Sequence, residues 1–206
     1  MTRALVKPCI HVSAALLLAA LGPACAGRRS YAKHQFVLEA TRPASPARQR
    51  HDVVLAVRGF TIDPVYDGTG LRYRKGESEY ESDFYNEFVI APQVLLGSQT
   101  RDWLSRSGLF QNVLEPGSLL EPTHALEGNI LVLHGDFRGG KAPRAVMEIR
   151  FFLIAIQSSP PQVVLTRDYQ ASQEAQAPTA GALVAAFDRC LEQILAALEE
   201  DLGKVL

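Results

Sequence analysis

Residues Ala145–Gln157, with the sequence AVMEIRFFLIAIQ, decide the fold class of this chain of 206 residues. The first part of the stretch alternates apolar side chains with Glu148 and Arg150, and the rest is apolar throughout. A period of two is typical of a β-strand with one buried face, because successive side chains point to opposite sides of a sheet. The stretch therefore predicts a long strand whose apolar face lies against the core.

Two further strands flank this one along the chain. We expect the first over 125–137 and the second over 163–171, where apolar and polar side chains alternate again. Short turn sequences, Arg138–Lys141 and Ser158–Pro161, separate the three segments. Strands joined by such short connections form an antiparallel meander.

A β-α-β unit is predicted before the meander. Val53–Val57 is a nearly continuous apolar run, as in a strand covered on both faces. Pro92 suits the first position of a helix that runs to about Ser107, and Gly108 suits the position just beyond its end. Because a strand over Leu109–Leu114 follows, we expect a right-handed parallel pair. The expected buried stripe of the helix is Leu95, Leu96, Gln99, Trp103 and Leu104.

The last helix is expected from Pro178–Thr179 to about Gly203, and one broad face of it is apolar. Its apolar residues recur at helical spacing: Leu183, Phe187, Cys190, Leu191, Ile194, Leu195, Leu198 and Leu202. Together these segments predict an α/β (α+β) domain. Its mixed sheet is expected to have about five to six strands, with the C-terminal amphipathic helix packed on one face.

The N-terminus has the pattern of a secretory leader. Arg3 and Lys7 precede Val12–Leu21, an Ala- and Leu-rich run of about ten residues that is too short to span a bilayer. We therefore expect residues 1–24 to be a lipoprotein signal peptide.

Cys25 directly follows this leader and is the expected attachment point of a covalent diacylglycerol lipid. Leu21–Cys25 has the form of an irregular lipobox, in which Gly22 occupies the position where leucine usually stands. Acyl chains would hold the protein to a membrane. Ordinary signal cleavage nearby, which leaves no anchor, is the alternative.

Residues 25–52 are predicted to form a lipid-anchored tether, within which Tyr31–Ala40 has the pattern of a first strand. The Pro-, Ala- and Arg-rich stretch that follows offers too little apolar surface to fold. The periplasmic domain is then expected to occupy residues 53–206.

Neither the composition nor the motifs favour catalysis, a metal or a bound cofactor. The formal net charge is −1 and no Lys/Arg cluster is present, which argues against nucleic acid as a partner. The chain has no Gly-x-Ser-x-Gly motif, and Cys190 has apolar neighbours at helical spacing. His134 and Asp136 share one face of a predicted strand, but structural zinc normally needs four ligands. We therefore expect a protein that is not an enzyme.

The segment Leu71–Phe88 mixes aromatic with charged residues and is the best candidate for a contact surface. Tyrosine buries a large area while keeping a polar tip, which suits an interface. The alternative is that half of these rings pack beneath the first helix. The candidate partner-binding residues are Tyr73, Arg74, Tyr80, Phe84, Tyr85 and Phe88.

Four short motifs follow one another along the chain: GLRYR at 70–74, YESDFYNEF at 80–88, PQVLL at 92–96 and SGLFQNV at 107–113. In order and spacing they resemble the ABC-type transport auxiliary lipoproteins, the PqiC-like lipoprotein partners of MCE-type lipid transporters. The resemblance covers nearly the whole chain.

The resemblance implies a non-enzymatic accessory subunit that works with an MCE-family protein and with the permease and ATPase of an ABC transporter. Such a system moves phospholipids or similar apolar molecules across the bacterial envelope. Ala26 after Cys25 favours the outer membrane over the inner membrane, and the oligomeric state, including a homo-oligomer, stays open. The alternative function is a stand-alone periplasmic lipoprotein that binds a lipid or small ligand in a pocket between the sheet and the helices.

Overall fold

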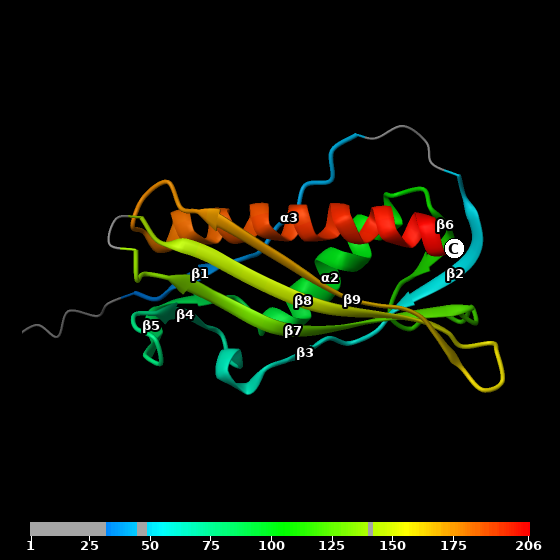
Figure 1. Ribbon diagram of the computed structural model, residues 1–206, viewed down its shortest axis with the longest axis horizontal. Coiled ribbons are helices and arrows are strands. Elements are labelled where there is room, and N and C mark those ends of the chain that lie inside the picture. The colour runs from blue at the N-terminus through cyan, green and yellow to red at the C-terminus, as the bar shows by residue number, and fades with distance from the viewer. Residues whose placement is uncertain (1–31, 45–48, 140–141) are drawn as a thin grey trace, which may run out of the picture. The chain divides into compact units, whose positions relative to one another are not determined.

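The long strand β7 (His124–Asp136) is the centre of the sheet in this computed structural model, which describes residues 32–44, 49–139 and 142–206 (Figure 1). Along one edge β7 pairs over its whole length with β8 (Arg144–Ala155), and β8 pairs in turn with β9 (Gln162–Glu174). Both pairings are antiparallel, so the predicted meander is confirmed.

Three successive segments share the other edge of β7, and all of them run parallel to it: β2 (His51–Val57), β3 (Thr61–Ile62) and β4 (Gly70–Arg74). A single 3-10 turn, Pro64–Tyr66, separates β3 from β4. The outer edge of β2 pairs in parallel with β6 (Phe110–Leu114). Because α2 (Pro92–Ser105) lies between β2 and β6 in the chain, the predicted parallel pair with a helical crossover is confirmed.

On the far side of β4 the sheet continues through β5 (Tyr80–Phe88), which is antiparallel to β4, to β1 (His34–Phe36), which is parallel to β5. The predicted fold class is confirmed, but the described residues form a sheet of nine strands rather than five to six. Strand β1 lies within the stretch 31–40, where a first strand was predicted. Strand β3 is an additional strand of only two residues, too short to show a period of two.

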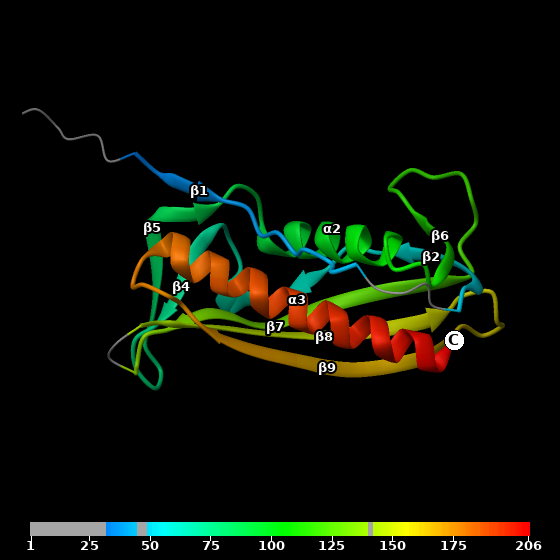
Figure 2. The same cartoon turned by 90° about the horizontal axis from the view of Figure 1, so that it is seen from above.

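The two helices share one core with the sheet. Helix α3 (Ala180–Val205) lies over β8 and β9, and α2 lies beside it in contact with β2 and β6 (Figure 2). The hydroxyl of Thr179 caps α3 by accepting a hydrogen bond from the Ala182 N–H. Helix α2 ends at Ser105, two residues before the predicted end, and Gly108, with a φ of +74°, then turns the chain toward β6 in the left-handed conformation that glycine favours.

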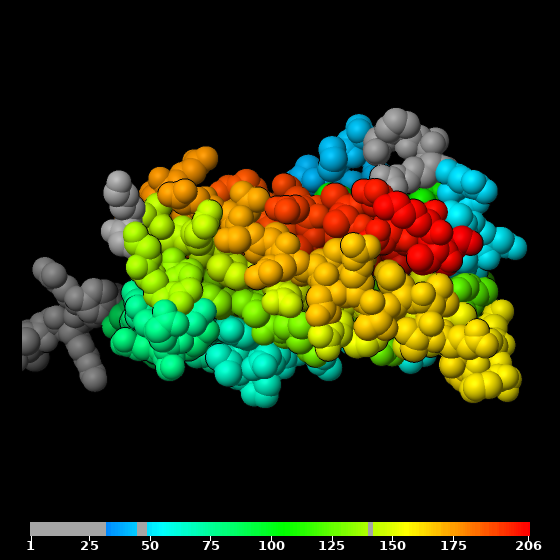
Figure 3. Space-filling model, in the orientation of Figure 1, coloured from blue at the N-terminus to red at the C-terminus, as the bar shows by residue number. Residues whose placement is uncertain are grey.

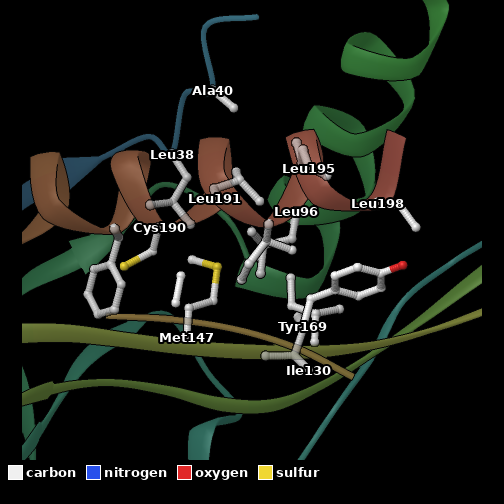
Figure 4. Close-up of a cluster of buried hydrophobic side chains, with 14 of the residues drawn as sticks. Leu38, Ala40, Leu96, Ile130, Met147, Tyr169, Cys190, Leu191, Leu195 and Leu198 are labelled. Carbon is white, nitrogen blue, oxygen red and sulfur yellow. The ribbon is translucent and has the colours of Figure 1, made fainter. Parts of the chain in front are cut away.

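Side chains from both helices and all three meander strands meet in this core (Figure 4). Met147 on β8 lies among Ile130, Tyr169, Leu96 and Leu191, each exposed by 6% or less. On the side of the domain that Figure 3 shows, α3 and β9 form much of the surface. Cys190 is fully buried, as predicted, and burial raises the pKa of its thiol to about 12. The space between the sheet and the helices is thus filled with packed side chains.

The segment after β1 crosses the two helices instead of hanging free. Leu38 is fully buried, and the backbone N–H groups of the next three residues donate to side-chain oxygens on the helices. The acceptors are Asp188 for Glu39, Gln99 for Ala40 and Glu192 for Thr41.

Arg42 completes the attachment of this segment. Its guanidinium donates twice to Glu199, at 2.8 Å each, and the same carboxylate accepts from the indole N–H of Trp103 at 2.8 Å. The tether predicted over residues 25–52 therefore needs a correction in its described part. The stretch has few apolar residues, but the polar side chains of α2 and α3 satisfy its backbone and hold it in place.

The predicted signal peptide and Cys25 lie outside the described residues. Of the helices in the part of the chain that the structure describes, none has the length and apolar character needed to cross a membrane.

Candidate interaction surface

A bulge in β5 shapes the most conspicuous surface of the domain. Gly70 of β4 lies opposite Glu87, whereas Arg72 lies opposite Ser82, so residues 83–86 of β5 face only Leu71. Extra residues on one strand of an antiparallel pair break the alternation of the side chains and turn some of them outward.

The carboxylate of Asp83 holds this bulge together. Its Oδ1 accepts hydrogen bonds from the backbone N–H groups of Tyr85 and Asn86, at 2.7 and 3.0 Å. Its Oδ2 accepts from the Tyr73 hydroxyl at 2.7 Å and from the Asn86 amide at 2.8 Å. Partial burial acts to raise the pKa of Asp83, but the hydrogen bonds from Tyr73 and Asn86 outweigh it and lower that pKa. The ionised carboxylate is therefore the form that organises the strand.

Gly70 makes room for the bulge on the neighbouring strand. A Cβ atom at this position would lie 2.6 Å from the Ser82 hydroxyl oxygen and 2.8 Å from the Asp83 carbonyl oxygen. Only glycine allows the two strands to approach so closely. Gly70 of the GLRYR motif and the bulged residues 83–86 of the YESDFYNEF motif thus form one local structure.

The bulge displays two aromatic rings, those of Phe84 and Tyr85, which we call the aromatic knob. Their side chains are 68% and 43% exposed, and the rings meet edge to face with centroids 5.2 Å apart. The ammonium group of Lys33 lies 4.7 Å from the Phe84 ring centroid and 2.9 Å from the Glu87 carboxylate. The knob is therefore a rigid apolar projection with a cation beside it.

The other four predicted partner-binding residues have structural roles. Phe88 is buried against Phe187, and Tyr73 is buried beside Phe137, so neither ring reaches a partner directly. Arg74 donates to the backbone carbonyls of residues 76 and 77 and thereby closes the β4–β5 turn. Tyr80, 37% exposed, rests edge-on against His134. Phe84 and Tyr85 project from the surface as one pair, whereas the Tyr80 ring lies 5.8 Å from the Arg74 guanidinium.

Solved structures resemble this domain over most of its length. Protein XCC0632 from Xanthomonas campestris, described by the family model DUF330, superposes with a TM-score of 0.70 at 19% sequence identity, over 85% of this chain and 94% of that chain. An uncharacterised protein superposes with a TM-score of 0.64 at 16% identity, over 83% of this chain and 99% of that chain. This chain has the fold of that DUF330 protein. No protein-family model and no curated protein matches the sequence.

His134 and Asp136, the pair that shares a strand face in the sequence, form no joint site within the DUF330-type fold. His134 is 4% exposed and stacks on Tyr66, and burial lowers the pKa of its imidazole to about 4. Asp136 instead pairs with Arg138 at 2.7 Å, which lowers its pKa to about 2. Across residues 32–44, 49–139 and 142–206, no three potential metal ligands gather.

Two surface features of the domain had no counterpart among the predicted site residues. One is a hollow of about 400 Å³ beside α2, lined by Phe60, Val94 and Gly97 and flanked by Arg58 and Arg101. The other is a group of exposed aliphatic side chains where β5 leads into α2. The exposure of single aliphatic residues cannot be predicted from the sequence, because the same residue types fill protein cores.

Proposed function

We propose that this protein is a lipid-anchored periplasmic lipoprotein that acts as a non-catalytic accessory subunit of an ABC/MCE-type transporter of phospholipids or similar apolar molecules. The aromatic knob is the observation that carries the proposal. A strand that breaks its own pairing to expose two large rings has a surface suited to docking on a partner.

The geometry of the knob supports a protein partner. The Asp83 hydrogen bonds fix the strand that bears Phe84, so little conformational entropy is lost when the ring enters a pocket. Burying a phenylalanine side chain contributes about 1.5–3 kcal/mol, which is enough for a binding hot spot. The resemblance of the motifs around the bulge to the auxiliary lipoproteins suggests an MCE-family protein as that partner.

Isolation of the tagged full-length protein from its own cells tests this function. The wild type is expected to retain an MCE-family protein together with the permease and the ATPase, and Phe84→Ser is expected to lose them. Leu119→Ser is the matched control, because Leu119 is fully exposed on the loop between β6 and β7 and far from the knob (Figure 1). Equal retention by all three proteins, or no transporter component with the wild type, would refute the proposal.

The anchor is tested separately by mass spectrometry of the native protein. We expect an N-terminal Cys25 that carries diacylglycerol, in a protein that fractionates with the outer membrane. An unmodified polypeptide that starts at another residue would remove the anchor from the proposal without affecting the knob.

A stand-alone ligand-binding lipoprotein is the second candidate, and the hollow beside Phe60 favours it. A volume of about 400 Å³ and an apolar lining suit part of an acyl chain. The space between the sheet and the helices, where the sequence placed such a pocket, is filled by packed side chains such as Leu96 and Met147. Phospholipid extracted from the purified protein, and lost in a Gly97→Leu variant, would support this candidate.

A further inference from the structure

A partly apolar surface lies where β5 leads into α2. Val89, Ile90 and Val94 are 39%, 45% and 55% exposed there. The chain has no charged residue from Phe88 to Thr100, so no acidic or basic side chain of this stretch interrupts the surface.

The end of β1 adds a fourth aliphatic side chain. The Val89 N–H donates to the Phe36 carbonyl at 2.9 Å, which places Val37, 44% exposed, next to the turn that follows β5. Figure 2 shows this turn beside the end of β1. We call Val37, Val89, Ile90 and Val94 the aliphatic corner.

The corner adjoins the place where the chain enters the domain. Lys33, the residue before β1, is eight positions after Cys25 in the sequence. An extended chain covers at most about 3.6 Å per residue, so a lipid on Cys25 holds Lys33 within about 30 Å of the bilayer. Leu119 and Leu120, exposed by 100% and 57%, lie at the other end of the domain from β1 (Figures 1 and 2).

We infer that the aliphatic corner rests on the lipid bilayer and fixes the orientation of the domain, an inference that depends on the proposed anchor at Cys25. A bilayer suits the corner better than a protein partner does. Protein hot spots are rich in Trp, Tyr and Arg, and the corner consists of Val and Ile alone. Apolar side chains that enter the interfacial region add to the hold of the acyl chains, and their contact selects one face of the protein.

Tryptophan reporters in the full-length lipidated protein test this orientation. Ile90→Trp places a reporter in the corner, at a residue that is 45% exposed, and Leu119→Trp places one at a fully exposed residue at the other end. The native Trp103 is only 2% exposed and gives a constant background. Each protein is reconstituted into phosphatidylethanolamine–phosphatidylglycerol vesicles, with and without phosphatidylcholine whose acyl chains carry bromine, a fluorescence quencher confined to the bilayer.

The Ile90→Trp protein is expected to lose emission in brominated vesicles and to shift its emission to shorter wavelength, whereas Leu119→Trp keeps the emission that it has in plain vesicles. If both proteins float with the vesicles but bromine changes the emission of the two variants equally, the inference is overturned, whereas the proposed anchor is not affected. Proteins that do not float with vesicles at all would instead refute the anchor. Protection of the residue-90 reporter from aqueous acrylamide in native envelope membranes, but not in vesicles, would assign the corner to a protein partner and overturn the inference.

Discussion

Strands β8 and β5 belong to the same sheet but differ in how regularly they pair and in how their side chains are buried. In β8 every second side chain from Ala145 to Leu153 is fully buried, and the strand pairs on both edges. In β5 the regular pairing with β4 stops after Ser82, and the next four residues face a single residue of β4. The core side chains of β8 are buried by distant parts of the chain, whereas the shape of β5 comes from one carboxylate and its near neighbours. Strand β8 therefore contributes mainly to the stability of the core, whereas β5 exposes side chains on the surface.

The largest expected effect is the loss of a ring from the regular strand. Phe151 is fully buried between Phe60 and Tyr169, with ring centroids 5.7 and 5.8 Å away. Phe151→Ala is expected to lower the free energy of unfolding by about 3–5 kcal/mol, because it removes buried area and leaves a cavity. Chemical denaturation measures this change. The neighbour Phe152 points to the other face of the sheet, and a Phe152→Ala variant that cost as much would contradict the one-sided burial of β8.

The second effect arises at His134 of β7, against which the Tyr80 ring of β5 lies. His134 has a pKa of about 4 in the folded domain and about 6.5 when unfolded. Because the folded-state pKa is the lower one, the contribution of His134 to stability is complete above pH 6.5 and is lost as the pH falls toward 4, by about 3 kcal/mol in all. His134→Phe keeps a ring against Tyr66 and should abolish this loss.

Unfolding curves of the wild type and of His134→Phe, recorded from pH 7 to pH 4, check the prediction. Asp188 acts in the opposite direction, since burial raises its pKa to about 6 and its protonation favours folding as the pH falls. The difference between the two proteins cancels that contribution. Parallel curves at all pH values would show that His134 does not titrate in this window.

The third effect removes the organiser of the bulge. Asp83→Ala leaves the buried Tyr73 hydroxyl and two backbone N–H groups without their acceptor, so we expect a loss of about 1–3 kcal/mol. If the bulge exists to present the knob, partner retention falls in this variant even under conditions where the domain stays folded. Asp83→Asn keeps one acceptor oxygen and should fall between the alanine variant and the wild type in both measurements.

The smallest expected change in stability is at the knob itself. Phe84→Ser should alter the free energy of unfolding by no more than about 0.5 kcal/mol, since the ring is mostly solvated. Its effect on partner retention is expected to be the largest of the series. A variant that unfolds readily would instead make Phe84 a structural residue and would remove the contrast between the two strands.

The parts of the fold that were predictable from sequence are long segments in which the hydrophobic pattern repeats many times. The strand over 145–157 and the last helix repeat their pattern often enough to identify both the element and its buried face. The segment around Leu38 could not be predicted in this way, because its partners are side chains of α2 and α3 that only the folded chain brings near. The bulge had a local signal, since an aspartate that bonds the N–H groups two and three residues ahead is typical of a turn. In the aromatic segment, periodicity did not separate the buried rings from the exposed ones.

The contact between Arg42 and Glu199 joins residues 157 positions apart. During synthesis Arg42 is added to the chain long before Glu199. Most nascent chains therefore contain Arg42 without its partner. The core in which Leu38 is buried also includes residues of α3 (Ala180–Val205). Docking of the segment around Leu38 therefore has to wait until α3 is made, and a chain truncated before α3 lacks the helix against which this segment docks.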